Sequence, residues 1–122
     1  MSITTINFAN TEIIYLDLEG VYNTENQISQ IKDINRFLEK SETPRLILIN
    51  LSGFMPGPGF MEFATKTINL RATKVKKAAY FGLEKQNHNV YKYYDKFNSE
   101  IIKRENFKTK IEAIEWLIDT NS

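Results

Sequence analysis

The segment from Pro44 to Phe60, PRLILINLSGFMPGPGF, constrains the fold of this chain more than any other. It starts with an apolar run over 46–49 and then changes to polar and turn-forming residues. A short apolar run bounded by turn residues is typical of a strand that is buried on both faces. The Pro/Gly cluster predicts a stiff turn, with Pro58 at the start of the next helix. In open α/β sheets, loops at the carboxyl ends of parallel strands are where ligands and partners bind, so this loop marks the predicted working face.

The segments before it predict a hairpin and a helix. Residues 2–8 and 13–19 alternate between apolar and polar side chains, as half-buried strands do, and residues 9–12 are turn-forming. Thr24 and Gln27 have the spacing of a capping box, which predicts a helix that starts there and ends before Pro44.

The segments after it continue the alternation of helices and strands. Their apolar spacing predicts a helix over 59–72, a strand over 75–81, a helix over 86–98 and a short strand over 100–104. A second capping box, Thr109 with Glu112, predicts a last helix. Its inward-facing residues are expected to be Ala113, Ile114, Leu117 and Ile118.

The predicted fold is therefore α/β, with the order β-β-α-β-α-β-α-β-α in a single domain over residues 1–122. Alternating strands and helices after a hairpin favour a mostly parallel sheet with an antiparallel N-terminal edge strand. If the strands are added in chain order, right-handed crossovers place the helices mainly on one face. A chain of 122 residues is long enough to bury a core of its own.

The composition indicates the cellular compartment of the protein and excludes several kinds of chemistry. The chain has no cysteine, which excludes disulfides, thiolate chemistry and cysteine-based zinc sites, and fits a reducing compartment. The N-terminus has no basic segment followed by an apolar run, and no apolar run approaches the ~20 residues that span a bilayer. We therefore expect a cytoplasmic protein without a signal peptide or a membrane span.

The formal net charge is only +1, but the charges are unevenly distributed. Residues 64–110 hold twelve basic and four acidic residues, whereas the rest of the chain is acidic. This pattern indicates either an anion-facing surface or lysines that coat solvated helix faces. Nucleic-acid binding is not expected, because no recognition motif accompanies the basic residues. The densest basic group is Lys66, Arg71, Lys74, Lys76 and Lys77.

Three segments of the chain resemble the STAS or anti-sigma-factor-antagonist (SpoIIAA-like) domain, and in particular an uncharacterised bacterial subgroup of it. They are the strand–loop–helix LINLSGFMPGPGF, the strand VKKAAYFGL and the closing FKTKIEAIEWL. The resemblance covers the whole chain and depends on the order and spacing of these segments. It implies a STAS-like fold and a regulatory or protein-binding function.

The resemblance also implies where a regulatory switch would lie. In regulatory members, the loop after the central strand reads like D-S-S-G-L, and a partner kinase phosphorylates a serine there. The matching segment is Pro56–Phe60, in which Gly59 matches the family glycine. The serine position falls on Gly57 or Pro58, so we expect no phosphorylation switch in this chain.

Two sets of residues are candidate binding sites. The first is a docking loop whose helix N-terminus could hold an anion, made of Met55, Pro56, Gly57, Pro58, Gly59 and Phe60. The alternative for this loop is a turn and a helix start, with an aromatic residue packed in the core. The second is an apolar pocket with phenol groups as polar anchors, made of Tyr80, Tyr91 and Tyr94. Helix–sheet packing is the alternative for these rings.

The sequence favours a non-enzymatic function. His88 is the only histidine, and no nucleophile–base pair or metal-ligand spacing accompanies it. Asp17 and Glu19 share the polar face of a strand, where solvated carboxylates are commoner than a catalytic dyad. We therefore expect no metal and no cofactor.

The leading hypothesis is a protein-binding or regulatory module, a monomer or a homodimer, with an unidentified protein partner. The alternative is a carrier or sensor of a small apolar or anionic ligand, such as a lipid or a nucleotide.

Overall fold

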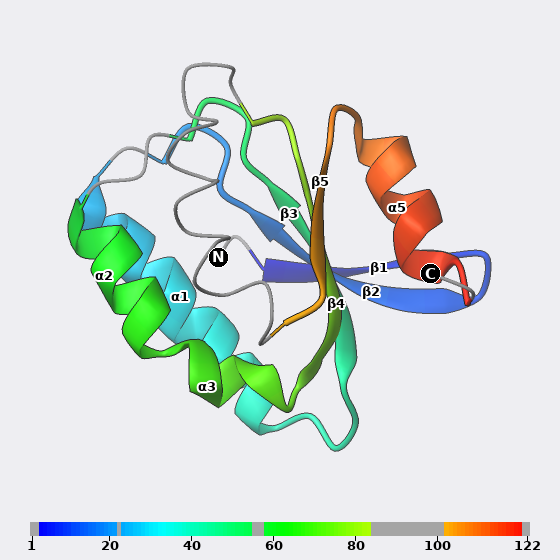
Figure 1. Cartoon of the computed structure of the whole chain (residues 1–122), viewed down its shortest axis with the longest axis horizontal. Helices are drawn as coiled ribbons and strands as arrows, with labels where there is room; N and C mark the ends of the chain where they lie inside the picture. The colour runs from blue at the N-terminus through cyan, green and yellow to red at the C-terminus, as the bar shows by residue number, and fades with distance from the viewer. Residues whose placement is uncertain (1–2, 22, 55–57, 84–101, 121–122) are drawn as a thin grey trace.

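A five-stranded sheet forms the centre of the protein (Figure 1). The computed structural model describes residues 3–21, 23–54, 58–83 and 102–120. The strands lie in chain order, with β1 antiparallel to β2 and every other neighbouring pair parallel. This arrangement confirms the predicted mostly parallel sheet with an antiparallel N-terminal edge strand. The strands are β1 (Ile3–Phe8), β2 (Thr11–Asp17), β3 (Arg45–Asn50), β4 (Val75–Phe81) and β5 (Arg104–Phe107).

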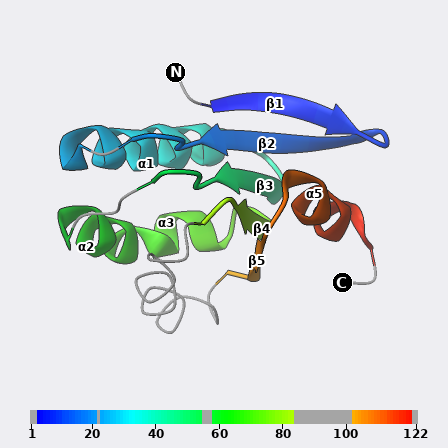
Figure 2. The ribbon, with the colours of Figure 1, turned by 90° about the horizontal axis from the view of Figure 1, so that it is seen from above.

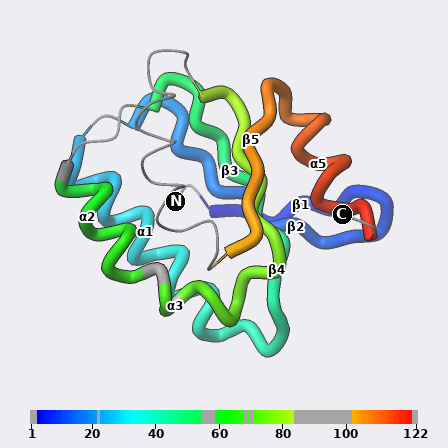
Figure 3. Tube along the Cα trace, in the orientation of Figure 1, coloured from blue at the N-terminus to red at the C-terminus, as the bar shows by residue number. Residues whose placement is uncertain are grey.

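Helices cover both faces of the sheet (Figures 2 and 3). Three of them, α1 (Thr24–Glu39), α2 (Pro58–Lys66) and α3 (Ile68–Ala72), lie on one face because they belong to crossovers of the same hand between neighbouring parallel strands. The last helix, α5 (Lys110–Ile118), follows the final strand, so no crossover constrains it, and it covers the opposite face. The prediction that the helices lie mainly on one face holds for the described crossover helices.

The strand β3 is buried from both sides, as its apolar run predicts. Ile47 and Ile49 belong to the core cluster under α1 and α2, whereas Leu48 is fully buried in the cluster under α5. The α5 cluster also contains the predicted inward residues Ala113, Ile114 and Leu117 of the last helix. Burying apolar residues on both faces of one strand joins the two cores across the sheet.

One predicted cap and two predicted element boundaries were wrong. The first helix begins at Thr24, as predicted, but its cap is Asn23, whose side chain accepts the backbone N–H of Asn26. The helix predicted over 59–72 is interrupted at Thr67 and forms α2 and α3. The short strand predicted over 100–104 lies instead over Arg104–Phe107. The helix predicted over 86–98 lies outside the described residues.

The capping box predicted for the last helix is confirmed. The Thr109 hydroxyl accepts the backbone N–H of Glu112 at 3.3 Å, and it donates to the Glu112 carboxylate at 2.8 Å. This pairing satisfies a free N–H at the start of α5 and fixes where the helix begins.

Two members of the basic group are buried, so neither of the two expected roles, an anion-facing surface or a coat of solvated side chains, applies to them. Arg71 is 7% exposed, and its guanidinium donates to the Asn35 side chain, the Thr67 hydroxyl and the Ala64 carbonyl. It therefore ties α1, α2 and α3 together. Lys77 is 4% exposed on the opposite face, so the basic group is not one patch.

The ammonium group of Lys77 holds the end of the last helix. Its Nζ donates to the carbonyl oxygens of Trp116 at 2.9 Å and Asp119 at 2.8 Å. Unpaired carbonyls at a helix C-terminus favour such a cation. Burial lowers the pKa of Lys77, with a smaller contribution from the charge of Lys103.

Candidate functional site

Backbone hydrogen bonds join the loops at the carboxyl ends of β2, β3 and β4. The N–H of Leu18 donates to the Asn50 carbonyl at 3.0 Å, and that of Gly20 donates to the Ser52 carbonyl at 3.2 Å. On the other side, the N–H of Leu51 donates to the Phe81 carbonyl at 2.8 Å. The loops therefore form one connected edge, which we call the carboxyl edge and define as residues 18–21, 51–54 and 81–83.

Glycine allows close packing at this edge. Gly82 has a φ of 80°, and a Cβ atom there would lie 2.1 Å from the Ser52 hydroxyl oxygen. Any other residue would be strained at this φ, and its Cβ atom would displace the Ser52 hydroxyl. Gly53 also has a positive φ, of 63°, which turns the chain directly after β3. The shape of the edge is thus set by the backbone.

A buried amide connects the polar groups beneath the carboxyl edge. The Asn50 side chain is 6% exposed, and its Nδ2 donates to the Asp17 carboxylate at 3.2 Å and to the Tyr15 hydroxyl at 3.3 Å. Its Oδ1 accepts the backbone N–H of Ser52 at 2.9 Å. Burial raises the pKa of Tyr15, although the hydrogen bond from Asn50 opposes this shift.

The carboxylates at this edge serve the local structure. Asp17 accepts the side-chain amide of Asn50 and the backbone N–H of Glu19, at 3.0 Å, through the same oxygen. Glu19 is exposed. Asp17 is therefore a hydrogen-bond acceptor that stabilises the loops. The positions of Asp17 and Glu19 do not suggest a catalytic acid–base pair.

The predicted docking loop is described only in part. Met55, Pro56 and Gly57 lie outside the described residues, and Pro58 begins α2. Phe60 is 8% exposed, and its ring packs edge-on against that of the buried Phe54 at a centroid distance of 5.1 Å. The loop is thus anchored at both ends by core aromatic residues, and its role in binding stays a prediction.

Gly59 brings the start of α2 close to the first helix. A Cβ atom at Gly59 would lie 3.0 Å from the Thr24 methyl carbon. The glycine that matches the family motif therefore has a packing role between α1 and α2.

The predicted aromatic pocket also stays a prediction. Tyr80 is half-buried and packs against the core on the face of α1, and the Arg104 guanidinium lies 4.9 Å from its ring centroid. Tyr91, Tyr94 and His88 lie outside the described residues. On the other face of the sheet, the Trp116 ring packs against that of Phe107 of β5 at a centroid distance of 5.7 Å.

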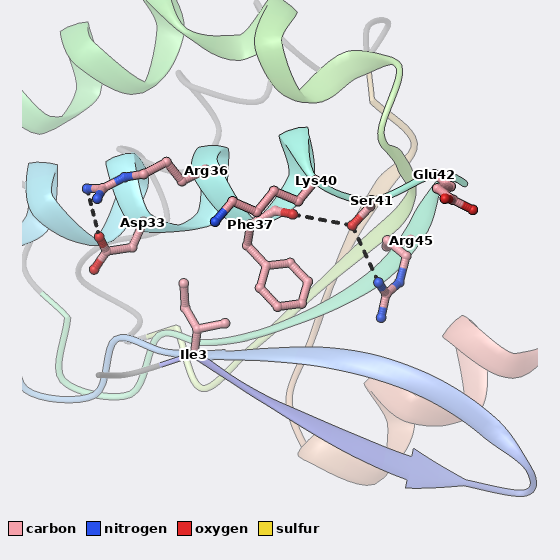
Figure 4. Close-up of a pocket in the computed structure, with 8 residues that line it drawn as sticks. All are labelled: Ile3, Asp33, Arg36, Phe37, Lys40, Ser41, Glu42 and Arg45. Atoms are coloured by element: carbon pink, nitrogen blue, oxygen red, sulfur yellow. Dashed lines mark hydrogen bonds and ion pairs between the residues drawn. The ribbon is translucent and has the colours of Figure 1, made fainter.

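A groove that the sequence did not predict lies at the opposite end of β3 (Figure 4). It has a volume of about 530 Å³ and lies between the C-terminal half of α1 and the start of β1. Arg36 pairs with Asp33 at 3.2 Å, and Arg45 pairs with Glu12. No sequence motif marks the groove, because it depends on the distance between a helix and a strand. Its lining is Ile3, Asp33, Arg36, Phe37, Lys40, Ser41, Glu42 and Arg45.

Two classes of feature are absent from the described part of the chain. Within residues 3–21, 23–54, 58–83 and 102–120, no group of three or more His, Cys, Asp or Glu side chains is arranged to hold a metal ion. Over the same ranges, no helix is long and apolar enough to cross a membrane.

Comparison with known proteins identifies the fold. No protein-family model matches the chain, and no curated protein is a significant match. A crystal structure does match, that of an uncharacterised protein of the DUF3478 family with a SpoIIAA-like fold from Shewanella loihica PV-4. The TM-score is 0.69 at 14% sequence identity, over 94% of this chain and 91% of that chain. This chain therefore has a SpoIIAA-like fold, as its sequence predicts.

Proposed function

We propose that this chain is a small non-enzymatic module that binds a partner protein through its carboxyl edge. The observation that carries the proposal is the set of backbone hydrogen bonds that joins the loops after β2, β3 and β4. A rigid surface loses little conformational entropy on binding, so loops held in this way suit recognition. Loops at the carboxyl ends of parallel strands are also the usual binding position in open α/β sheets.

The chemistry of the edge favours binding over catalysis. The Asn50 side-chain amide donates to both Asp17 and Tyr15, and the Ser52 hydroxyl lies against Gly82. An activated nucleophile needs a base within hydrogen-bond reach, and none of the described groups supplies one to Ser52. The described polar groups of this edge therefore support its shape.

The proposed module works without a phosphorylation switch. The residues at the family serine position, Gly57 and Pro58, have no hydroxyl group. The nearest upstream hydroxyl, that of Ser52, lies in the turn after β3 and outside the matching segment, so it is a poor substitute for the family serine. A cytoplasmic location remains a prediction and belongs to the same proposal.

Reversing one charge at the carboxyl edge is expected to reduce partner binding at least tenfold. Glu19 is exposed, and the backbone N–H of the next residue, Gly20, donates to Ser52. Glu19→Arg would place an unfavourable charge and a longer side chain in the interface without disturbing the core. Binding is measured by capture of proteins from an extract of the source cells, followed by titration of the recovered partner.

Glu115→Arg is the matched control, because Glu115 is also exposed but lies on α5. It should retain the partner that the wild-type chain binds. If Glu19→Arg binds every recovered protein as well as Glu115→Arg does, or if no protein is recovered at all, the proposal fails. A lipid or nucleotide that copurifies with the chain would favour the ligand-carrier alternative.

A further inference from the structure

The strand β1 is an edge of the sheet that carries none of the usual protections against pairing. Its six residues, ITTINF, include no charged residue and no proline, and no strand of the described residues lies beyond it (Figure 2). Natural proteins usually protect an exposed edge with charges, prolines or bulges. The opposite edge strand, β5, carries Arg104 and Glu105. The bare edge of β1 is therefore suited to pair with another strand.

The hairpin determines which backbone groups of β1 face outward. Phe8 and Thr11 flank a two-residue turn, in which Ala9 and Asn10 have φ values of 50° and 62°. Such a turn makes its flanking residues a hydrogen-bonded pair. Since these pairs alternate along an antiparallel ladder, Ile6 and Thr4 also bond inward to β2. The N–H and C=O groups of Ile3, Thr5 and Asn7 consequently point away from the sheet.

Apolar side chains flank this edge on both faces. On the face of α5, Ile6 is partly buried and Phe8 is 38% exposed. On the face of α1, Ile3 lies over the groove beside Phe37 (Figure 4). A strand added to β1 would cover part of this apolar surface in addition to pairing with the backbone.

We propose that a second copy of this chain pairs with β1 in antiparallel orientation, with Thr5 opposite Thr5 of the second copy. In this register Ile3 lies opposite Asn7, so the outward backbone groups of both strands face each other. These pairs would exchange about six hydrogen bonds. Two five-stranded sheets would join into one continuous sheet about a twofold axis.

Charge favours a second copy over an unrelated strand as the occupant. A twofold interface brings each group close to its own copy, so a charged edge would repel itself, whereas the β1 strand is neutral. The neighbouring groove carries both signs, with Asp33 and Glu42 beside Arg36, Lys40 and Arg45. A surface of mixed charge can be complementary to itself. This interface uses the outer backbone groups of β1, none of which belongs to the carboxyl edge as defined above, so it does not depend on the proposed function.

The test uses opposite charges at the twofold axis. Thr5 is exposed, so Thr5→Lys and Thr5→Glu should both fold, as circular dichroism can verify. The wild-type chain is expected to sediment as a dimer. Each variant alone should dissociate at least tenfold more readily, because two like charges would lie opposite each other. An equimolar mixture of the two should restore the dimer, and native mass spectrometry should show mainly the mixed species.

Thr43→Lys is the control, because Thr43 is exposed in the connection between α1 and β3, and it should leave the dimer intact. A wild-type chain that stays monomeric at its highest soluble concentration overturns the proposal and leaves the edge open to a foreign strand. A dimer that both Thr5 variants form as well as the wild type does, with no preference for the mixed species, overturns it too.

Discussion

Ile49→Asp is expected to unfold the protein or to lower its free energy of unfolding by roughly 4–5 kcal/mol, close to the whole stability of a small domain. Ile49 is 9% exposed in β3, at the centre of the sheet, and packs in the cluster under α1 and α2. A carboxylate there would lose its hydration and would find no cation among the apolar residues of the cluster. Urea denaturation followed by circular dichroism measures the effect.

Ile111→Asp is the matched control for this substitution. Ile111 is 48% exposed in the first turn of α5, where a carboxylate also interacts favourably with the helix dipole. Its effect on the free energy of unfolding should stay within about 0.5 kcal/mol. Equal effects of the two substitutions would contradict the burial of β3 on both faces.

Arg71→Met is expected to lower the free energy of unfolding by about 2–4 kcal/mol. The substitution keeps an unbranched apolar side chain but removes the donors to the Asn35 side chain and the Ala64 carbonyl. Both acceptors belong to the packed helices on one face, so they would stay buried without a donor. The loss of stability is measured as the decrease in the urea midpoint relative to the wild type, provided that the m-value is unchanged.

Arg36→Met separates this effect from the loss of any arginine. The Arg36 side chain is 69% exposed and forms only a surface pair with Asp33 at 3.2 Å. Exposed pairs of this kind contribute little, so the free energy of unfolding should change by less than about 1 kcal/mol. A small effect of Arg71→Met, similar to that of Arg36→Met, would mean that the buried arginine does not hold the three helices together.

The sequence predicted the elements whose patterns are local. The apolar run of β3 and the capping box at Thr109 each specify their element within a few residues, and both are where the sequence places them. The strand β5 was misplaced because RENF has no apolar run, and its position is fixed by pairing with Ala78–Phe81 of β4. The position of such a strand is determined by its pairing with the neighbouring strand and not by the local preference of its residues.

Tertiary contacts also explain which features of the candidate site the sequence did not predict. The predicted topology was enough to place the working face at the carboxyl ends of the strands. It could not show that Phe54 and Phe60 are both buried, because their burial depends on the contact between the two rings across the loop. Lys77 looks like a surface lysine in the sequence, because nothing local places the end of α5 within reach of its ammonium group. The groove beside α1 likewise requires Ile3 and Arg45, which are far apart in the chain, to lie near one helix.

Hydrogen–deuterium exchange of the wild-type chain, measured free and with the captured partner bound, tests the proposed binding edge most directly. Binding at the carboxyl edge should slow amide exchange in residues 18–21 and 51–54. Exchange in residues 41–45, at the opposite end of β3, should stay unchanged. Slower exchange over 41–45 and along α1, with no change at the carboxyl edge, would contradict the proposal and would place the partner in the groove.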